Sequence, residues 1–363
     1  MKYLDEFRSP AVVKGLLRRI RELDCSARIM EVCGTHTTAI SKFGLRSVLA
    51  PQVELISGPG CPVCVTSDAD IDRVIAVARM PDVIIATFGD MMKVPGSEGS
   101  LADASAEGAR VEVVYSPLEA LEIAKNDGDK RVVFLGVGFE TTAPAVASTL
   151  LQAADEGLDN FYLLSFHKLV PPALRALSLI PDFQIDGFIL PGHVSTIIGS
   201  DAYAFLAEEF GIPCVITGFE PADILQAIYL LLRMRQEGPS VRVEYSRAVR
   251  PEGNLKALSV MERVFDRVPA TWRGLFEIPD SGLSLKEEYS THDAGAWEVE
   301  LPGPVADKGC RCGEVLCGKI KPAECPLFAK KCTPEGPVGP CMVSSEGTCA
   351  SYYLYERPED EIA

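Results

Sequence analysis

The sequence predicts an α/β protein with two doubly wound parallel-sheet domains and a small cysteine-rich domain at its end. Two observations carry this prediction. Up to about residue 240, short β-branched runs alternate with segments of helical spacing, the pattern of parallel sheets covered on both faces. From Pro269 onward, glycine, proline and cysteine interrupt every segment, and seven of the twelve cysteines lie at or after residue 310. Such a region depends on a metal centre more than on a large apolar core.

Nine short apolar runs predict strands, and the segments between them predict helices. The strands are Arg28–Val32, Val53–Ser57, Val83–Phe88, Val111–Tyr115, Arg131–Leu135, Phe161–Phe166, Gly187–Leu190, Cys214–Thr217 and Val241–Tyr245. The helices are 11–24, Asp68–Arg79, Leu118–Lys125, Ala143–Ala154, Ala173–Ser178, Ala222–Met234 and Leu255–Phe265. So many strands in one chain favour two sheets.

A length of 363 residues is too great for one compact core. We expect an N-terminal helix and first strand over 1–40, packed on the C-terminal domain. An α/β domain over 41–130, a second over 131–240 and an iron–sulfur domain over 241–363 would follow.

Composition excludes several function classes. A net charge of −16 argues against binding nucleic acid or an anionic membrane surface, since both need clustered lysine and arginine. The chain start has no apolar leader segment, and no run reaches 18 apolar residues. A cytoplasmic location is expected, where cysteines serve as metal ligands or redox groups rather than as a disulfide framework.

Chemically active residue types follow the predicted strands. In parallel sheets the carboxyl ends of the strands share one edge, where ligands bind. The residues just past these ends are Cys33, Cys61, Gly89-Asp90, Gly138-Phe139-Glu140, His167, His193 and Gly218-Phe219-Glu220. We therefore expect them to line a common site.

The tail cysteines predict a metal centre. Four of them form the run Cys312-x12-Cys325-x6-Cys332-x16-Cys349. Structural zinc sites use tight pairs, whereas wide, uneven spacings suit the corners of a [4Fe-4S] cluster. Zinc, disulfides or free thiols are the alternatives, and spacing alone does not select four ligands from seven cysteines.

Cys61-Pro62-Val63-Cys64 follows a strand and precedes a helix for which Ser67 is the expected N-cap. A helix N-terminus lowers a thiol pKa, so this pair predicts a dithiol/disulfide couple. Half of a zinc site is the alternative, although no second C-x-x-C completes it.

Cys33-Gly34-Thr35-His36 follows the first strand. A cysteine and a histidine at this spacing can pair as thiolate and imidazole or ligate iron, and a buried structural cysteine is the alternative.

Two further loops follow strands. Gly136–Thr142, with Glu140, resembles a phosphate loop only loosely, because it lacks a third glycine and a lysine, and a polar loop capped by Thr142 is the simpler explanation. His193 in Pro191–Thr196 is a candidate proton donor or metal ligand, or an ordinary hydrogen-bonding loop residue.

Taken together, these motifs resemble the HypD family of [NiFe]-hydrogenase maturation factors. They appear in order over about residues 28–353: Cys33-Gly34-Thr35-His36, Gly58–Cys64, Gly138–Thr142, Pro191–Ile197 and the tail run C-x12-C-x6-C-x16-C. Cys317 departs from the pattern, which has a non-cysteine there. With Cys310 and Cys341 it leaves three tail cysteines unassigned, whereas Cys25 and Cys214 look like ordinary buried or peripheral cysteines.

The resemblance implies a cytoplasmic scaffold for assembly of the Fe(CN)2CO unit. It implies a [4Fe-4S] cluster on Cys312, Cys325, Cys332 and Cys349, in surroundings similar to those of ferredoxin–thioredoxin reductase. It implies that Cys33 binds the transient iron of the Fe(CN)2CO unit together with a small HypC-type chaperone. HypE as cyanide donor and, through the chaperone, the hydrogenase large subunit are the other implied partners.

The resulting hypothesis is a metallocofactor assembly scaffold with thiol redox and electron-transfer activity. The cluster would supply electrons to the Cys61/Cys64 couple or to the iron, and His36 and His193 would donate protons or bind the cyanide nitrogens. The rivals are a [4Fe-4S]-dependent thiol–disulfide reductase and a structural zinc protein that only docks partners. Nucleotide hydrolysis at Gly136–Thr142 is a weaker alternative.

Overall fold

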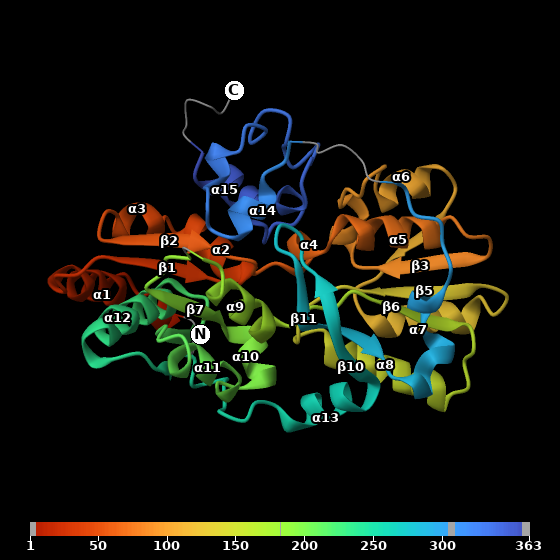
Figure 1. Ribbon diagram of the computed structural model, residues 1–363, viewed down its shortest axis with the longest axis horizontal. Helices are drawn as coiled ribbons and strands as arrows, with labels where there is room; N and C mark the ends of the chain where they lie inside the picture. Colours follow the sequence, from red (N-terminus) through yellow and green to blue (C-terminus); the bar gives the residue numbers. More distant parts are fainter. Residues whose placement is uncertain (1–4, 182, 304–308, 358–363) are drawn as a thin grey trace.

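A computed structural model describes residues 5–181, 183–303 and 309–357. Residues 1–4, part of the chain start considered above for a leader segment, lie outside it. The protein is α/β, with two parallel sheets side by side and a cysteine-rich region above them (Figure 1).

The first sheet has five strands in the order β2-β1-β7-β8-β9, and the second has four in the order β4-β3-β5-β6. Every pairing in both is parallel. The strands are β1 Ala27–Glu31, β2 Val53–Ser57, β3 Val83–Thr87, β4 Arg110–Val113, β5 Arg131–Gly136, β6 Phe161–Ser165, β7 Gly187–Pro191, β8 Cys214–Thr217 and β9 Val241–Val243. The nine predicted strands are therefore confirmed, with end positions that differ by at most two residues.

Sheet membership does not follow chain order. The chain starts the first sheet with β1 and β2, builds the whole second sheet, and returns to pair β7 with β1, Ile29 opposite Gly187. β4 and β5 both pair with β3, so one sheet spans residue 130, where the sequence predicted a boundary. The difference has a physical cause: local apolar patterns predict a strand but not its partner across the chain.

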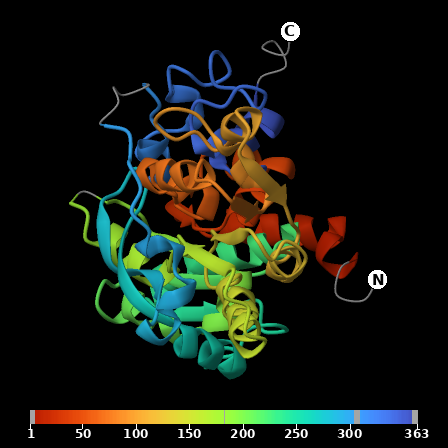
Figure 2. The ribbon, with the colours of Figure 1, turned by 90° about the vertical axis from the view of Figure 1, so that its right-hand side faces the viewer.

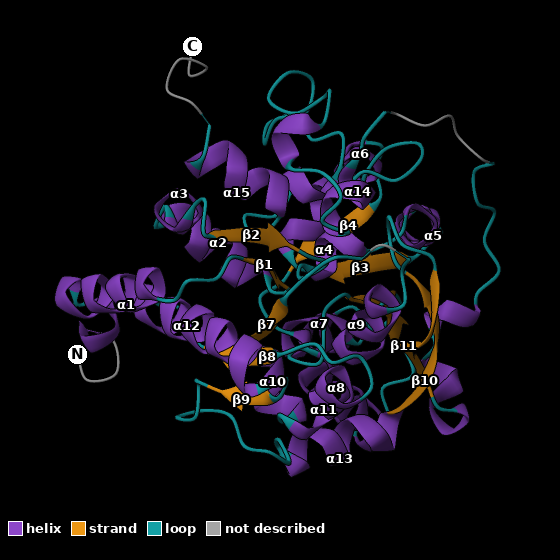
Figure 3. Ribbon diagram, turned by 60° about the vertical axis from the view of Figure 1, so that its left-hand side comes forward, coloured by secondary structure: helices purple, strands orange, loops and turns teal. Residues whose placement is uncertain are grey.

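Helices surround the two sheets, as Figure 3 shows. They are α1 Pro10–Glu22, α2 Gly34–Lys42, α3 Leu45–Leu49, α4 Pro62–Val65, α5 Asp68–Ala78, α6 Leu101–Ala106, α7 Pro117–Asn126, α8 Ala143–Asp155, α9 Val170–Ser178, α10 Gly192–Ile198, α11 Ala204–Glu208, α12 Pro221–Glu237 and α13 Leu255–Val264. No helix in the described ranges is long and apolar enough to cross a bilayer.

The N-terminal helix packs differently from the prediction. α1 buries Leu16 and Ile20 in the core that it shares with α12, beside the first sheet, instead of against the C-terminal domain. It is α2, directly after β1, that packs against the C-terminal helix α15 (Thr348–Tyr355).

An antiparallel hairpin went unpredicted. β10 (Phe265–Thr271) and β11 (Glu277–Leu285) pair across a bulge and contact the second sheet through β6 and α9. Pro269 and Gly282 within these strands are residues that usually interrupt a strand. The apolar contacts of the hairpin form only in the tertiary structure. Trp272, 1% exposed, stacks on Phe139 and donates from its indole N–H to the Ser281 hydroxyl.

The cysteine tail, residues 309–357, lies above both sheets (Figures 1 and 2). Its regular structure is limited to α14 (Cys312–Leu316), α15 and short 3₁₀ turns, one of them Pro340–Met342. Loops make up the rest.

Candidate functional site

A cavity of about 810 Å³ opens between the carboxyl ends of the two sheets. We call it the cleft. Loops after β1, β2, β3, β4, β5 and β7 contribute to it, together with one tail residue. Among its lining residues are Cys33, Gly60, Asp90, Gly138, Thr142, His193 and Glu346. The structure thus brings Cys33 and His193 together at one cavity, while Cys61, Cys64, His36 and Glu140 do not line it.

Cys33 is the N-cap residue of α2 and is 8% exposed. Its backbone N–H donates to the buried Glu31 carboxylate at 3.1 Å, and the Thr37 hydroxyl donates to the same carboxylate at 2.6 Å. Burial raises the pKa of the Cys33 thiol to about 12, more than the nearby backbone N–H groups lower it. An isolated Cys33 is therefore a thiol at neutral pH, and a cation that binds it must displace the proton.

The Cys33 and Cys61 loops touch directly. Gly34 N–H donates to Gly60 O at 2.8 Å, and a Cβ on Gly60 would lie 2.1 Å from Cys33 N. Only glycine permits this approach. From the other side, the Thr35 hydroxyl donates to the tail residue Glu346 at 2.6 Å.

Cys61 is the N-cap of the short helix α4, and its sulfur accepts from Cys64 N–H at 3.3 Å. The expected capping of α5 by Ser67 is confirmed: its hydroxyl accepts from Asp70 N–H, and the Asp70 carboxylate accepts in turn from Ser67 N–H. The expected lowering of the thiol pKa is wrong for Cys64. Burial first, and then contact with the thiols of Cys341 and Cys61, raises the pKa of Cys64 well above its usual value.

The tail gathers its cysteines around one small cavity. Six thiols line it: Cys310, Cys312, Cys325, Cys332, Cys341 and Cys349. Cys317 does not, and its sulfur lies 3.6 Å from Gly274 O instead. All twelve cysteines fall in the described residues, and all are free thiols.

The side chains that line this cavity are of the chemical type that binds an iron–sulfur cluster. Clusters take cysteine thiolates, and the lining thiols outnumber the four that are needed. Nowhere in the described ranges do three or more His, Cys, Asp or Glu side chains converge as they would around a single metal ion. The central space is only about 10 Å³, roughly one water-sized sphere, so a cluster requires the loops to open outward.

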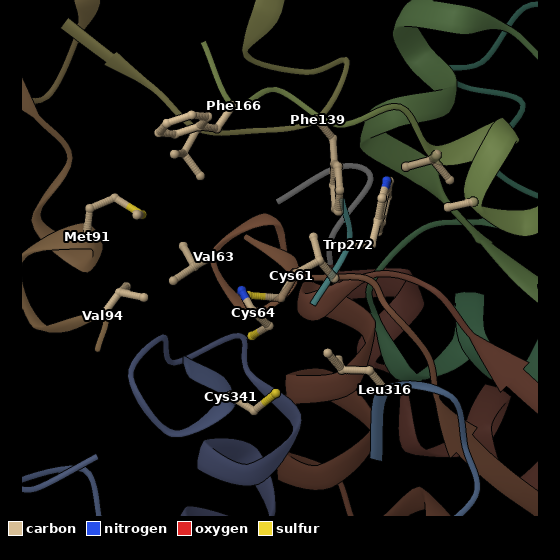
Figure 4. Close-up of a cluster of buried hydrophobic side chains, with 14 of the residues drawn as sticks. Cys61, Val63, Cys64, Met91, Val94, Phe139, Phe166, Trp272, Leu316 and Cys341 are labelled. Atoms are coloured by element: carbon tan, nitrogen blue, oxygen red, sulfur yellow. The ribbon is translucent and has the colours of Figure 1, made fainter. Parts of the chain in front are cut away.

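Cys341 links this cavity to the Cys61–Cys64 loop. Contact with Cys312 lowers its pKa, contact with Cys349 raises it, and with burial its pKa is about 11. It also contacts Cys64, whose sulfur lies 3.9 Å from Pro340 O. Figure 4 shows the sulfurs of Cys64 and Cys341 facing each other. A continuous series of thiols therefore runs from the tail cavity to Cys61.

The rings of His36 and His193, the two histidines predicted for the site, both pack against Phe219. Phe219 lies 4.8 Å from the ring of His36 and 4.0 Å from that of His193. His36 is fully buried and donates from Nε2 to Gly218 O at 2.9 Å, since a carbonyl can only accept. Its Nδ1 has no hydrogen-bond partner among the described residues. Burial lowers the pKa of His36 to about 4, and partial desolvation also lowers the pKa of His193, which is exposed at the cleft.

Glu140 points into the protein rather than into the cleft. It is 2% exposed and accepts from Val170 N–H at 2.9 Å. Burial raises its pKa to about 7. His167 is likewise buried, with Nδ1 at 3.1 Å from the Ser165 hydroxyl. Both lie at the predicted sheet edge but outside the cleft lining, because the side-chain direction after a strand depends on the following turn.

Glu31 and Arg46, two residues that support the cysteine loops, were not predicted from the sequence. Arg46 donates to Ser57, which precedes the Cys61 loop, and to Glu356 at the end of α15. Its Nη2 also lies 4.0 Å from Glu31, which holds the Cys33 loop. The signal for Glu31 was available, since a carboxylate follows the apolar pair Ile29-Met30 at the end of the strand.

Comparison with known proteins identifies the family of the chain. The family model described as "HypD: Hydrogenase formation hypA family" matches residues 11–356. The chain is 46% identical over 370 residues to the hydrogenase maturation factor HypD of Rhodobacter capsulatus, covering 98% of both chains. It is 46% identical over 372 residues to HypD of Escherichia coli K12, covering 99% of this chain and 100% of the relative. A putative hydrogenase expression/formation protein of Methanocaldococcus jannaschii is 42% identical over 353 residues, covering 96% of this chain and 98% of the relative.

Proposed function

The chain belongs to the HypD family of hydrogenase maturation factors, and we propose that it is the redox-active scaffold on which the Fe(CN)2CO unit is assembled. Assembly takes place with a HypC-type chaperone, which then carries the unit to the hydrogenase large subunit. One observation carries the proposal. A cleft thiol, Cys33, lies in a loop packed on the Cys61 loop, from which contacting thiols continue to the tail cavity.

Cys33 binds the incoming iron. Its thiol lines the cleft, and its raised pKa keeps it protonated until a cation replaces the proton. Soft thiolate suits low-spin iron, and a cysteine of the chaperone completes the pair. His193 lines the same cleft, where its exposed ring can accept that proton or donate a hydrogen bond to a cyanide nitrogen. His36 holds its place through Gly218 O and stays neutral.

The tail would hold a [4Fe-4S] cluster on Cys312, Cys325, Cys332 and Cys349, and when bound there it supplies single electrons. Cys61, Cys64 and Cys341 lie in contact between that cavity and the cleft loops. Cys61 and Cys64 exchange between dithiol and disulfide, two electrons and two protons at a time.

A specific contact favours an alternative ligand set. Cys312 touches Cys341, which touches Cys64, so Cys312 could belong to the redox-active thiols. Cys310 lines the same cavity and would then be the fourth ligand. Cluster content of Cys310→Ser and Cys312→Ser, from iron and acid-labile sulfide, separates the two sets, because only the true ligand's loss removes the cluster.

Infrared spectroscopy of the anaerobically purified chain, with its small chaperone and HypE, tests the function. Bands of metal-bound CO and cyanide are expected from the complex. Cys33→Ala should lose the bands and keep its iron and sulfide, whereas Cys325→Ala should lose the brown colour. Bands that persist undiminished in Cys33→Ala would contradict its role.

A thiol–disulfide reductase of the ferredoxin–thioredoxin reductase type is the second candidate. The observation in its favour is the contact of Cys64 with a tail thiol. Catalytic reduction of a generic protein disulfide, without any diatomic-ligand bands, would support this function over the assembly scaffold.

A further inference from the structure

A turn in the tail is closed onto two of its cysteines. Residues 327–332, which we call the lysine turn, are held by hydrogen bonds from Cys332 N–H to Leu327 O at 2.9 Å and from Phe328 N–H to Cys325 O at 3.0 Å. Ala329 adopts a left-handed conformation with φ 55°, which makes the turn tight. The turn tip is therefore joined directly to Cys325 and Cys332, which line the tail cavity.

The tip carries two exposed lysines, Lys330 and Lys331. Neither takes part in an ion pair among the residues described here, whereas Lys321, also in the tail, pairs with Glu54 at 3.2 Å. In a protein of net charge −16, two adjacent exposed lysines next to Cys332 place positive charge beside a candidate redox centre.

Two more basic residues extend this surface. Phe328 of the turn packs on Tyr353, at 6.3 Å between ring centroids, and the Arg357 guanidinium lies 4.1 Å from the Tyr353 centroid. The pKa of Glu335 is lowered mainly by hydrogen bonds from its own backbone N–H and from Thr333. Lys93 and Arg357 lie close enough to lower it further. The basic surface thus combines the lysine turn with Arg357 and Lys93, which lie near the carboxylate of Glu335.

We propose that this basic surface is the docking site of a small acidic one-electron carrier, of the ferredoxin or flavodoxin class, which reduces the tail cluster past Cys325 and Cys332. The proposal rests on the proposed function, since it needs a cluster. In each encounter one electron leaves the reduced carrier and enters the oxidised [4Fe-4S]2+ cluster to give [4Fe-4S]+, and no bond forms or breaks. Opposite charge accelerates such encounters, whereas the rest of this acidic chain repels an acidic carrier.

The test is a binding titration of the cluster-loaded chain with an acidic [2Fe-2S] ferredoxin by calorimetry. The double variant Lys330→Glu/Lys331→Glu should bind about tenfold more weakly than the wild type at low ionic strength. The difference should largely disappear at about 0.3 M salt, where charges are screened. Stopped-flow reduction by the same ferredoxin should slow in parallel, while reduction by dithionite stays unchanged.

Lys14→Glu/Lys256→Glu is the matched control. It makes the same change in net charge at exposed residues of α1 and α13, which lie away from the tail (Figure 1). The control should bind ferredoxin like the wild type at both salt concentrations. An unaffected lysine-turn variant, or an equal loss in both variants, overturns the proposal. Absence of iron and acid-labile sulfide from the purified chain would instead contradict the proposed function. That result comes from elemental analysis and is distinct from the binding data.

Discussion

Gly60 is the residue at which the two reactive loops meet. A Cβ there would clash with Cys33 N and lie 2.4 Å from Val32 C, and neither backbone atom can turn aside. We therefore expect Gly60→Ala to lower the free energy of unfolding by about 3 kcal/mol. Anaerobic urea unfolding measures the change.

Gly15→Ala is the matched control. A Cβ at Gly15, inside α1, would meet no atom within 4 Å. Alanine should raise the free energy of unfolding by about 0.5–1 kcal/mol, because it restricts the unfolded chain. If Gly60→Ala matched the wild type in stability, close packing of the two loops would not be a constraint.

Glu140 predicts a pH dependence of stability. Burial raises its pKa from 4.5 to about 7, so between these values the folded protein binds more protons than the unfolded chain. The stability contribution of protonated Glu140 is then complete below about pH 4.5 and is lost as the pH rises through about 7. A glutamine side chain in its place cannot ionise. From pH 5 to pH 8, the wild type should therefore lose about 2–3 kcal/mol more than Glu140→Gln.

Urea unfolding at several pH values, without oxygen, gives this difference. Glu287→Gln, at an exposed carboxylate, should lose stability with pH in parallel with the wild type. Curves for Glu140→Gln and wild type that run parallel over this range would mean that Glu140 is already ionised in the fold.

The helices and strands around the cleft are joined by Arg46. Its side chain, 13% exposed, connects β2, α2 and α15 by bonds to Ser57, Ser41 and Glu356. Arg46→Met would leave Glu31, 0% exposed, without its nearest positive charge. We expect a loss of about 3–5 kcal/mol in the free energy of unfolding.

Arg175→Met provides the comparison for Arg46. It breaks the pair with Glu209, in which both side chains are about half exposed, and should cost about 0–1 kcal/mol. Thermal unfolding of both variants checks the contrast. Equal losses would show that Arg46 acts only as an exposed ion pair does.

The cysteine tail should depend on its cluster more than the two sheets do. Its described part has two helices and short turns, and it shares one apolar core with both sheets. Each sheet has in addition a second apolar core to which the tail does not contribute. Removal of the cluster, by chelation or by Cys325→Ser, should speed amide hydrogen exchange across residues 309–347 by about tenfold or more. Strands β3 and β5 should keep their protection. Equal loosening of tail and sheets would contradict independent stabilisation.

Local pattern was a good guide to elements and a poor guide to their partners. β2 and β8 begin and end at the predicted residues, because runs such as Val53–Ser57 are apolar by themselves. The hairpin β10–β11 was missed, since its residues become buried only against β6 and α9. The pairing of β1 with β7, more than 150 residues apart, leaves no local trace either.

The candidate site divides in the same way. The sequence shows which residue types follow each predicted strand. On that basis Cys33 and His193 were predicted as site residues, and the fold brings both to one cleft. The chain also contains the cysteine run of the tail. Only the tertiary structure decided that Glu140 turns inward, that Cys341 contacts Cys64, and that burial raises thiol pKa values where a helix N-terminus was expected to lower them. The reason is physical: element type depends on neighbours in sequence, whereas desolvation and contact between thiols depend on neighbours in space.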